Sequence, residues 1–227
     1  MKARVLYLED DPTLGFLTSD SLRMHGYEVE LIEDGTAALE AFKQSKFDLC
    51  IFDIVVPGLN GVELSKEIRS FNRDVPILFL SSRGLTEDRI EALKTGADDY
   101  LVKPFRVEEL ILKMEVFLRR SGKEQIEKEA DFNFGQLQFI PSKYTLTAGA
   151  EVHKLTARET ELLEFLWTRA NQVVKREEIL LQIWGDDDYF MGRSLDVFIS
   201  RLRKYLKSEP GIQIENVHGV GFEFKTN

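Results

Sequence analysis

The chain has 227 residues, a net charge of −9, 43% hydrophobic and 30% charged residues, and one cysteine, Cys50, which excludes an internal disulfide. No apolar run approaches the roughly 20 residues that span a bilayer, and the N-terminal residues turn acidic where a signal peptide needs an apolar core. We therefore expect a cytoplasmic protein without a membrane segment, with Cys50 as a buried structural thiol.

Short apolar runs alternate with helical periodicity in the first half of the chain. The predicted strands are Arg4–Leu8, Glu28–Ile32, Leu49–Phe52, Ile77–Leu80 and Tyr100–Val102, and the predicted helices lie near 13–25, 35–45, 60–70, 86–95 and 106–119. Each parallel strand pair needs a crossover connection, so this alternation predicts a five-stranded parallel sheet with helices on both faces.

The second half of the chain has a different rhythm. We expect a charged linker over 121–131, although this segment could instead extend the preceding helix. Brief strands at Phe132–Phe134, Leu137–Ile140, Tyr144–Thr147 and Glu151–Lys154 predict an antiparallel meander. Helices follow near 156–168, 175–183 and 193–207, the first with Thr156 and Glu159 as a capping box. A hairpin of Gln213–Val217 and Phe222–Lys225 ends the chain.

Polar side chains gather where the predicted parallel strands end. Glu9, Asp10 and Asp11 follow the first strand, Asp53 the third, and Ser81 with Ser82 the fourth, while Lys103 and Pro104 follow the fifth. Ligands of open α/β sheets bind at these carboxyl ends. Crowded carboxylates repel one another and need a hard cation, and oxygen ligands suit Mg²⁺. We read Asp11 as a solvated loop residue.

Asp53 stands in the run IFDIVVPG, where an ionised carboxylate is costly if it is buried without partners. A lysine and a hydroxyl at neighbouring strand ends offer such partners. We therefore favour a functional role for Asp53 over that of a solvated loop acid.

These residues resemble the receiver domain of two-component response regulators across residues 1–120. The similarity consists of the pair Glu9-Asp10, the D-x-x-x-P-G-x-x-G run from Asp53 to Gly61, the serine pair at 81–82, G-A-D-D-Y from Gly96 to Tyr100, and Lys103-Pro104-Phe105. The resemblance implies a flavodoxin-like (βα)5 receiver domain in which Asp53 accepts a phosphoryl group from a sensor histidine kinase. It also implies Mg²⁺ held by Glu9, Asp10, Asp53 and the backbone carbonyl of Val55, with Lys103, Ser81 and Tyr100 as phosphate-binding and switch residues.

Two other functions compete with this reading. A phosphatase of the haloacid-dehalogenase type also phosphorylates an aspartate at a strand end, but it needs a second acid two residues on, where this chain has Val55. We therefore expect no enzymatic turnover. The remaining alternative is a DNA-binding regulator that works without phosphorylation and keeps a vestigial acidic pocket.

The predicted helix at 193–207 is amphipathic. Leu195, Phe198, Ile199, Leu202 and Leu206 share one face, and Arg193, Val197, Ser200, Arg201 and Lys204 lie broadly on the other. The segment holds five basic residues and one acid. A basic stripe before a hairpin is typical of a major-groove helix with a wing, but charge alone fits a solvated surface helix equally well.

Motif order favours the first reading. Leu155-Thr156 with Glu159, Ile183-Trp184-Gly185, Arg193-Ser194-Leu195-Asp196-Val197 and Gly219-Val220-Gly221-Phe222 resemble the winged-helix effector domain of the OmpR/PhoB family over 132–227. The resemblance implies an α+β winged-helix domain that binds double-stranded promoter DNA. The candidate DNA-binding residues are Arg193, Ser200, Arg201, Arg203, Lys204, Asn216 and His218.

This chain departs from the family pattern at three positions. Phe198 replaces a residue that is often polar, and Asn216 and His218 stand where Thr and Arg are common. A neutral histidine neutralises phosphate poorly, so the wing contact is expected to be weaker or pH-sensitive. The loop 185–192 corresponds to one that can meet RNA polymerase in the family. The alternative is a solvated loop whose aromatic residues tuck into the core.

Family members pair through the face of the fourth helix, fifth strand and fifth helix. By resemblance, we expect a homodimer on phosphorylation through this face, because complementary charges suit a two-fold interface. Ordinary solvated charges are the alternative. The candidate residues are Arg89, Asp98, Asp99, Glu109, Lys113 and Arg119.

Overall fold

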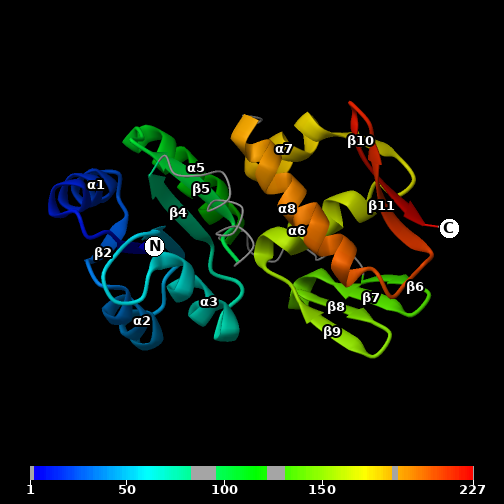
Figure 1. The fold of residues 1–227 in the computed structure, drawn as a ribbon, viewed down its shortest axis with the longest axis horizontal. Helices are drawn as coiled ribbons and strands as arrows, with labels where there is room; N and C mark the ends of the chain where they lie inside the picture. Colours follow the sequence, from blue (N-terminus) through cyan, green and yellow to red (C-terminus); the bar gives the residue numbers. More distant parts are fainter. Residues whose placement is uncertain (1–2, 83–95, 122–130, 186–188, 227) are drawn as a thin grey trace. The chain divides into compact units, whose positions relative to one another are not determined.

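The chain forms two compact units, Met1–Lys123 and Glu124–Asn227. The computed structural model describes residues 3–82, 96–121, 131–185 and 189–226 (Figure 1). No helix among these residues is long and apolar enough to cross a membrane.

The N-terminal unit is built on a five-stranded parallel sheet. Its strands are β1 (Arg4–Leu8), β2 (Glu28–Ile32), β3 (Leu49–Asp53), β4 (Ile77–Ser82) and β5 (Asp99–Lys103), in the order β2-β1-β3-β4-β5. This order is the flavodoxin-like one and places the chain's reversal between β1 and β3. The predicted strands are confirmed, and three of them run one or two residues further than expected.

Helices cover both faces of this sheet (Figure 1). The described ones are α1 (Pro12–Met24), α2 (Gly35–Gln44), α3 (Gly61–Phe71) and α5 (Val107–Ser121). The helix predicted near 86–95 lies outside the described residues. Asp11 caps α1 by accepting hydrogen bonds from the backbone N–H groups of Thr13 and Leu14 at 2.9 and 2.8 Å. This cap gives Asp11 a structural role, where the sequence suggested only a solvated loop.

Alternate residues of β1, which lies between β2 and β3, face opposite layers. Val5 and Tyr7 belong to a buried cluster with Leu22 of α1 and with Leu110 and Met114 of α5. The side chains of Cys50 and its strand neighbours are fully buried, which confirms the structural thiol. The residues that follow β1 and β3 at the carboxyl end of the sheet are therefore attached to paired, buried strands.

The C-terminal unit begins with the predicted antiparallel meander. Its strands are β6 (Phe132–Phe134), β7 (Leu137–Ile140), β8 (Thr145–Ala148) and β9 (Glu151–Lys154). A short 3₁₀ turn, η1 (Pro141–Lys143), precedes β8 and was not predicted. Tyr144 follows it in the left-handed conformation at φ 51°, so β8 starts one residue later than expected.

Three helices and a second small sheet complete this unit. The helices are α6 (Ala157–Trp167), α7 (Arg176–Trp184) and α8 (Tyr189–Tyr205), and the sheet has the order β10-β12-β11, with β10 (Val173–Lys175), β11 (Ile212–Val217) and β12 (Gly221–Thr226). The sequence did not predict β10, because three residues carry too little periodicity. It pairs with β12 and joins the hairpin to the start of α7.

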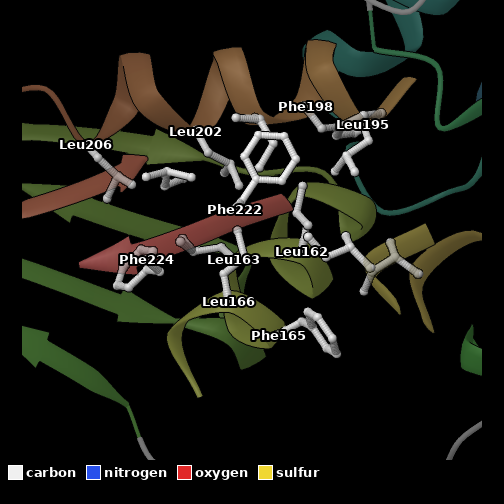
Figure 2. Close-up of a cluster of buried hydrophobic side chains, with 14 of the residues drawn as sticks. Leu162, Leu163, Phe165, Leu166, Leu195, Phe198, Leu202, Leu206, Phe222 and Phe224 are labelled. Atoms are coloured by element: carbon white, nitrogen blue, oxygen red, sulfur yellow. The ribbon is translucent and has the colours of Figure 1, made fainter. Parts of the chain in front are cut away.

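The apolar face of α8 packs on α6 and β12 (Figure 2). All five residues predicted for that face are buried, with Leu195, Phe198 and Leu202 fully enclosed. Val197, predicted for the opposite face, is also buried, so the apolar stripe of α8 is wider than expected. The capping box at the start of α6 is confirmed: the backbone N–H of Thr156 donates to Glu159 Oε2 at 2.9 Å, and Thr156 Oγ1 accepts from the backbone N–H of Glu159.

Candidate functional site

The carboxyl ends of β1, β3 and β5 bring three charged side chains together. Leu8 pairs with Phe52 across β1 and β3, so Glu9 and Asp53 follow at the same level of the sheet. Lys103 at the end of β5 reaches both carboxylates with its ammonium group. The predicted convergence of acids and lysine is therefore present.

Asp53 is 6% exposed, yet both of its carboxylate oxygens have donors. The backbone N–H of Val55 donates to Oδ1 at 3.0 Å, and Lys103 Nζ donates to Oδ2. These partners offset the cost of burying a carboxylate in an apolar strand. The side chain of Val55 itself is exposed, and this residue contacts Asp53 through its backbone N–H.

Glu9 is 1% exposed and shares the same ammonium group. Lys103 Nζ lies 2.8 Å from Oε1 and 2.6 Å from Oε2 of Glu9. Burial raises the pKa of Glu9, against the opposing hydrogen bonds from Lys103 and from the backbone of Asp11. Burial alone would lower the pKa of Lys103, but the hydrogen bonds to Asp53 and Glu9 outweigh it and the pKa is raised. Lys103 therefore stays a cation.

Two glycines in the loop after β3 stand where a larger residue would clash with its neighbours. Gly58 adopts φ 72°, which favours glycine, and a Cβ there would press on the Asp34 carboxylate. A Cβ on Gly61 would overlap the backbone carbonyl of Asp53. Asn60 then caps α3 in a capping box with Glu63. The D-x-x-x-P-G-x-x-G run thus packs the start of α3 directly against Asp53.

The acids fit a hard divalent cation. One oxygen from each of Glu9, Asp10 and Asp53 lies within 4.8 Å of the others, and Asp10 is exposed while the other two are buried. Hard oxygen donors of this kind, open to solvent on one side, suit Mg²⁺, which keeps several of its own waters.

The predicted switch residues are buried on the neighbouring strands β4 and β5. Ser81 is 5% exposed on β4, and its register partner on β5 is Val102. Tyr100 on β5 is also 5% exposed, so its ring lies inward here. The peptide bond between Lys103 and Pro104 is cis.

Three candidate dimer residues form ion pairs within the chain. Asp98 is 2% exposed and accepts from Arg69 Nη2 at 2.8 Å, and Asp99 is 1% exposed and accepts from Lys113 Nζ at 2.9 Å. Glu109 is exposed on α5. Arg89 lies outside the described residues, as does the side chain of Arg119.

The candidate DNA-binding residues of α8 differ in exposure and in what they contact. Ser200, Arg203 and Lys204 are exposed, whereas Arg201 is only partly exposed and donates from Nη1 to Glu159 Oε1 at 2.9 Å. Arg193 lies within α8, but its side chain is outside the described residues, as are Asp186–Asp188. Phe198 is fully buried and meets Trp184 edge-on at 5.5 Å between ring centres. Phe198 is therefore a core residue.

Arg203 ties α8 to the hairpin. Its Nε donates to the carbonyl of Ile214 at 2.7 Å, and Nη2 donates to Asn216 Oδ1 at 2.8 Å. His218 is exposed at the turn between β11 and β12. Arg203 thereby fixes α8 against the hairpin, and Lys204, Asn216 and His218 are exposed on these two elements.

Sequence reasoning missed three residues that shape these sites. Arg69 on α3 holds Asp98, Glu159 on α6 holds Arg201, and the Tyr7 hydroxyl lies 3.2 Å from Glu9 Oε2. A signal existed for Tyr7, because residues two apart on a strand share a face. Arg69 and Glu159 gave none, since their partners are 29 and 42 residues away.

Two family models match the chain. Residues 5–115 match "Response regulator receiver domain", and residues 149–224 match "Transcriptional regulatory protein, C terminal". Each match lies within one of the two compact units of the fold.

Similar proteins cover nearly the whole chain. The transcriptional regulatory protein RprY of Bacteroides fragilis is 42% identical over 99% of this chain and 95% of its own length. The response regulator MprA of a Mycobacterium strain is 36% identical over 98% of this chain and 97% of its own. Among solved structures, the response regulator DrrB of Thermotoga maritima, described as an OmpR/PhoB homolog, covers 99% of this chain and 100% of its own with 27% identity and a TM-score of 0.51. The chain belongs to the OmpR/PhoB family of response regulators, which regulate transcription.

Proposed function

We propose that Asp53 is the phosphoryl acceptor of this response regulator and that a sensor histidine kinase is the donor. The observation that carries the proposal is the environment of Asp53: a buried carboxylate at a strand end, with a lysine on one oxygen and a backbone N–H on the other. An ordinary solvent-exposed acid in a loop does not have such partners.

The reaction is a transfer of the phosphoryl group between two nucleophiles. A carboxylate oxygen of Asp53 forms a bond to phosphorus while the bond from phosphorus to the kinase histidine breaks, and the imidazole leaves with the bonding electron pair. Lys103 exchanges its carboxylate partners for a phosphoryl oxygen and balances the charge there. Attack of water on phosphorus later returns the free carboxylate. We propose that the chain's own chemistry is limited to these steps.

Mg²⁺ fits this proposal as the cofactor. Glu9, Asp10, Asp53 and the backbone carbonyl of Val55 would hold it, and the ion would neutralise charge on the phosphoryl oxygens. Asp10 is the exposed member of the set, so it offers the entry side for a hydrated ion.

Phosphorylation would be read out by Ser81 and Tyr100. The Ser81 hydroxyl can donate to a phosphoryl oxygen, and Tyr100, whose ring is already buried, would be held in that inward position. We further propose that the face around α5 then pairs two copies. Glu109 is available there as an exposed charge, while Asp98, Asp99 and Lys113 would first have to leave their partners within the chain.

The C-terminal unit would bind double-stranded promoter DNA through α8 and the hairpin. The exposed residues Ser200, Arg203, Lys204, Asn216 and His218 support this proposal, together with Arg193 from the same helix. Arg201 is retained as a candidate that would have to leave Glu159 to reach a base. Contact of the 185–192 loop with RNA polymerase stays a prediction, since Asp186–Asp188 lie outside the described residues.

Intact-mass measurement tests the phosphoryl acceptor. Incubation with Mg²⁺ and acetyl phosphate should add one phosphoryl mass to the wild-type chain and none to Asp53→Asn. Asp48→Asn is a matched control, because Asp48 is an exposed acid in the loop before β3. An adduct that survives Asp53→Asn would reject the assignment. Promoter binding that is equally strong with and without the adduct would instead favour the phosphorylation-independent regulator.

A further inference from the structure

Tyr7 connects the core of the N-terminal unit to the acidic pocket. Its side chain is fully buried on β1, among residues of α1 and α5, and its hydroxyl lies 3.2 Å from Glu9 Oε2. Tyr7 and Glu9 are two residues apart and leave the strand on the same face. The phenol therefore extends along β1 to reach the carboxylate.

The direction of this hydrogen bond is set by the carboxylate. An ionised carboxylate can only accept, so the Tyr7 hydroxyl donates its one proton to Glu9. Burial raises the pKa of the Tyr7 hydroxyl, and the side chain of Thr18 on α1, which is 1% exposed, lowers it. The Tyr7 hydroxyl is therefore a buried donor that ends on the acidic pocket.

Glu9 needs a second hydrogen-bond donor because it shares the ammonium group of Lys103 with Asp53. Lys103 bonds both oxygens of Glu9 and also Asp53. In the proposed reaction Lys103 turns to a phosphoryl oxygen, which leaves Glu9 with its neutral donors. The Tyr7 hydroxyl is such a donor. A glutamate has three rotatable side-chain bonds, so a fixed donor on one oxygen restricts where the other points.

We infer that Tyr7 is a positioning residue that holds Glu9 in the orientation required to bind a divalent cation. The inference rests on the proposed function, because it assigns Tyr7 to the cation site of that function. Tyr7 touches neither cation nor phosphoryl group; it acts through Glu9. Hydrogen-bond partners of ligating carboxylates carry a large share of metal affinity.

Mn²⁺ titration of the full chain, followed by the electron paramagnetic resonance signal of the free ion, tests this inference. Tyr7→Phe keeps the ring and removes only the hydroxyl, and we expect it to weaken Mn²⁺ binding about 10-fold. Tyr27→Phe is the matched control, since Tyr27 is a partly buried tyrosine before β2, at the opposite end of the sheet. Its affinity should equal that of the wild type. Equal affinities for Tyr7→Phe and the wild type would overturn the inference.

A double-mutant cycle separates positioning from a general structural effect. In a Glu9→Ala background, Tyr7→Phe should have no further effect on Mn²⁺ affinity, because the group it acts through is gone. Two independent losses would overturn the inference. Thr18→Val leaves Tyr7 in place and removes the buried hydroxyl that lowers the pKa of Tyr7, so we expect a smaller loss of roughly 3-fold. This variant also carries the test if Tyr7→Phe does not fold, and an unchanged affinity would then overturn the inference.

The proposed function and this inference fail differently. If the wild-type chain shows no saturable Mn²⁺ binding, the cation site of the proposed function is wrong and the role of Tyr7 is lost with it. If the wild type binds and Tyr7→Phe binds equally well, the inference alone is overturned.

Discussion

Arg201 donates from Nη1 to Oε1 of Glu159 at 2.9 Å and so joins α8 to the first turn of α6. The side chains of Arg201 and Glu159 are 15% and 2% exposed. Glu159 also completes the capping box with Thr156, and the Tyr205 hydroxyl lies 3.5 Å from the same Oε1. Arg201 therefore has a structural role within the C-terminal unit, which its basic charge in the sequence does not reveal.

We predict that Arg201→Ala lowers the free energy of unfolding of the C-terminal unit by about 3 kcal/mol, because it leaves the buried Glu159 carboxylate without its cation. Urea unfolding followed by the fluorescence of Trp167 and Trp184 measures the loss. Arg201→Lys should lose less. Undiminished stability together with weaker DNA binding would show instead that Arg201 serves the DNA alone.

Lys204→Ala should behave in the opposite way, because Lys204 is exposed. We expect unchanged stability, weaker binding to every DNA sequence, and a slope of log affinity against log salt that falls by about 1. Fluorescence anisotropy at several salt concentrations gives this slope, with Lys175→Ala as a control from another exposed lysine. An unchanged slope would place Lys204 outside the interface.

Asp98 is a candidate dimer residue whose buried pairing predicts a different effect. Its Oδ2 accepts from Arg69 Nη2 and from the backbone N–H of Ile77, both at 2.8 Å. Asp98→Ala should cost about 3–5 kcal/mol of stability, because a buried guanidinium loses its carboxylate. Chemical unfolding checks this cost. A stable Asp98→Ala chain that stays monomeric would favour the interface role.

Sedimentation of phosphorylated Glu109→Lys tests dimerisation more cleanly, since Glu109 is exposed.

Cys50 should react slowly with thiol reagents in the folded chain. It is fully buried, and burial raises the pKa of its thiol far above the ordinary range. A raised pKa keeps the neutral thiol, which is the unreactive form, throughout pH 7–9. Absorbance after addition of a disulfide reagent should therefore rise only as denaturant unfolds the N-terminal unit. Rapid reaction in native buffer would contradict the buried thiol.

Much of the fold was predictable from the sequence because local pattern and tertiary burial agree. The apolar residues predicted for β3 and for the buried face of α8 all lie in the core. The short strand β10 and the turn η1 were missed, since each has three residues and depends on its neighbours. Val197 was assigned to the wrong face because periodicity alone sets the centre of a stripe and leaves its width open.

The candidate site likewise has features that local sequence patterns predict and others that they do not. Glu9, Asp53 and Lys103 could be predicted to meet, because parallel strands end at one edge. The pairings of Asp98 with Arg69 and of Arg203 with Asn216 join residues distant in sequence or on separate elements, and no local pattern encodes them. Sequence therefore identified the charged groups and left their partners to the structure.

The central claim is that Asp53 alone carries the phosphoryl group. Reduction with borohydride converts an aspartyl phosphate to homoserine, which marks the modified residue permanently. After treatment with acetyl phosphate and Mg²⁺, peptide mapping by tandem mass spectrometry should find homoserine at position 53. Homoserine at another aspartate, or at none while the intact mass shows an adduct, would contradict the account.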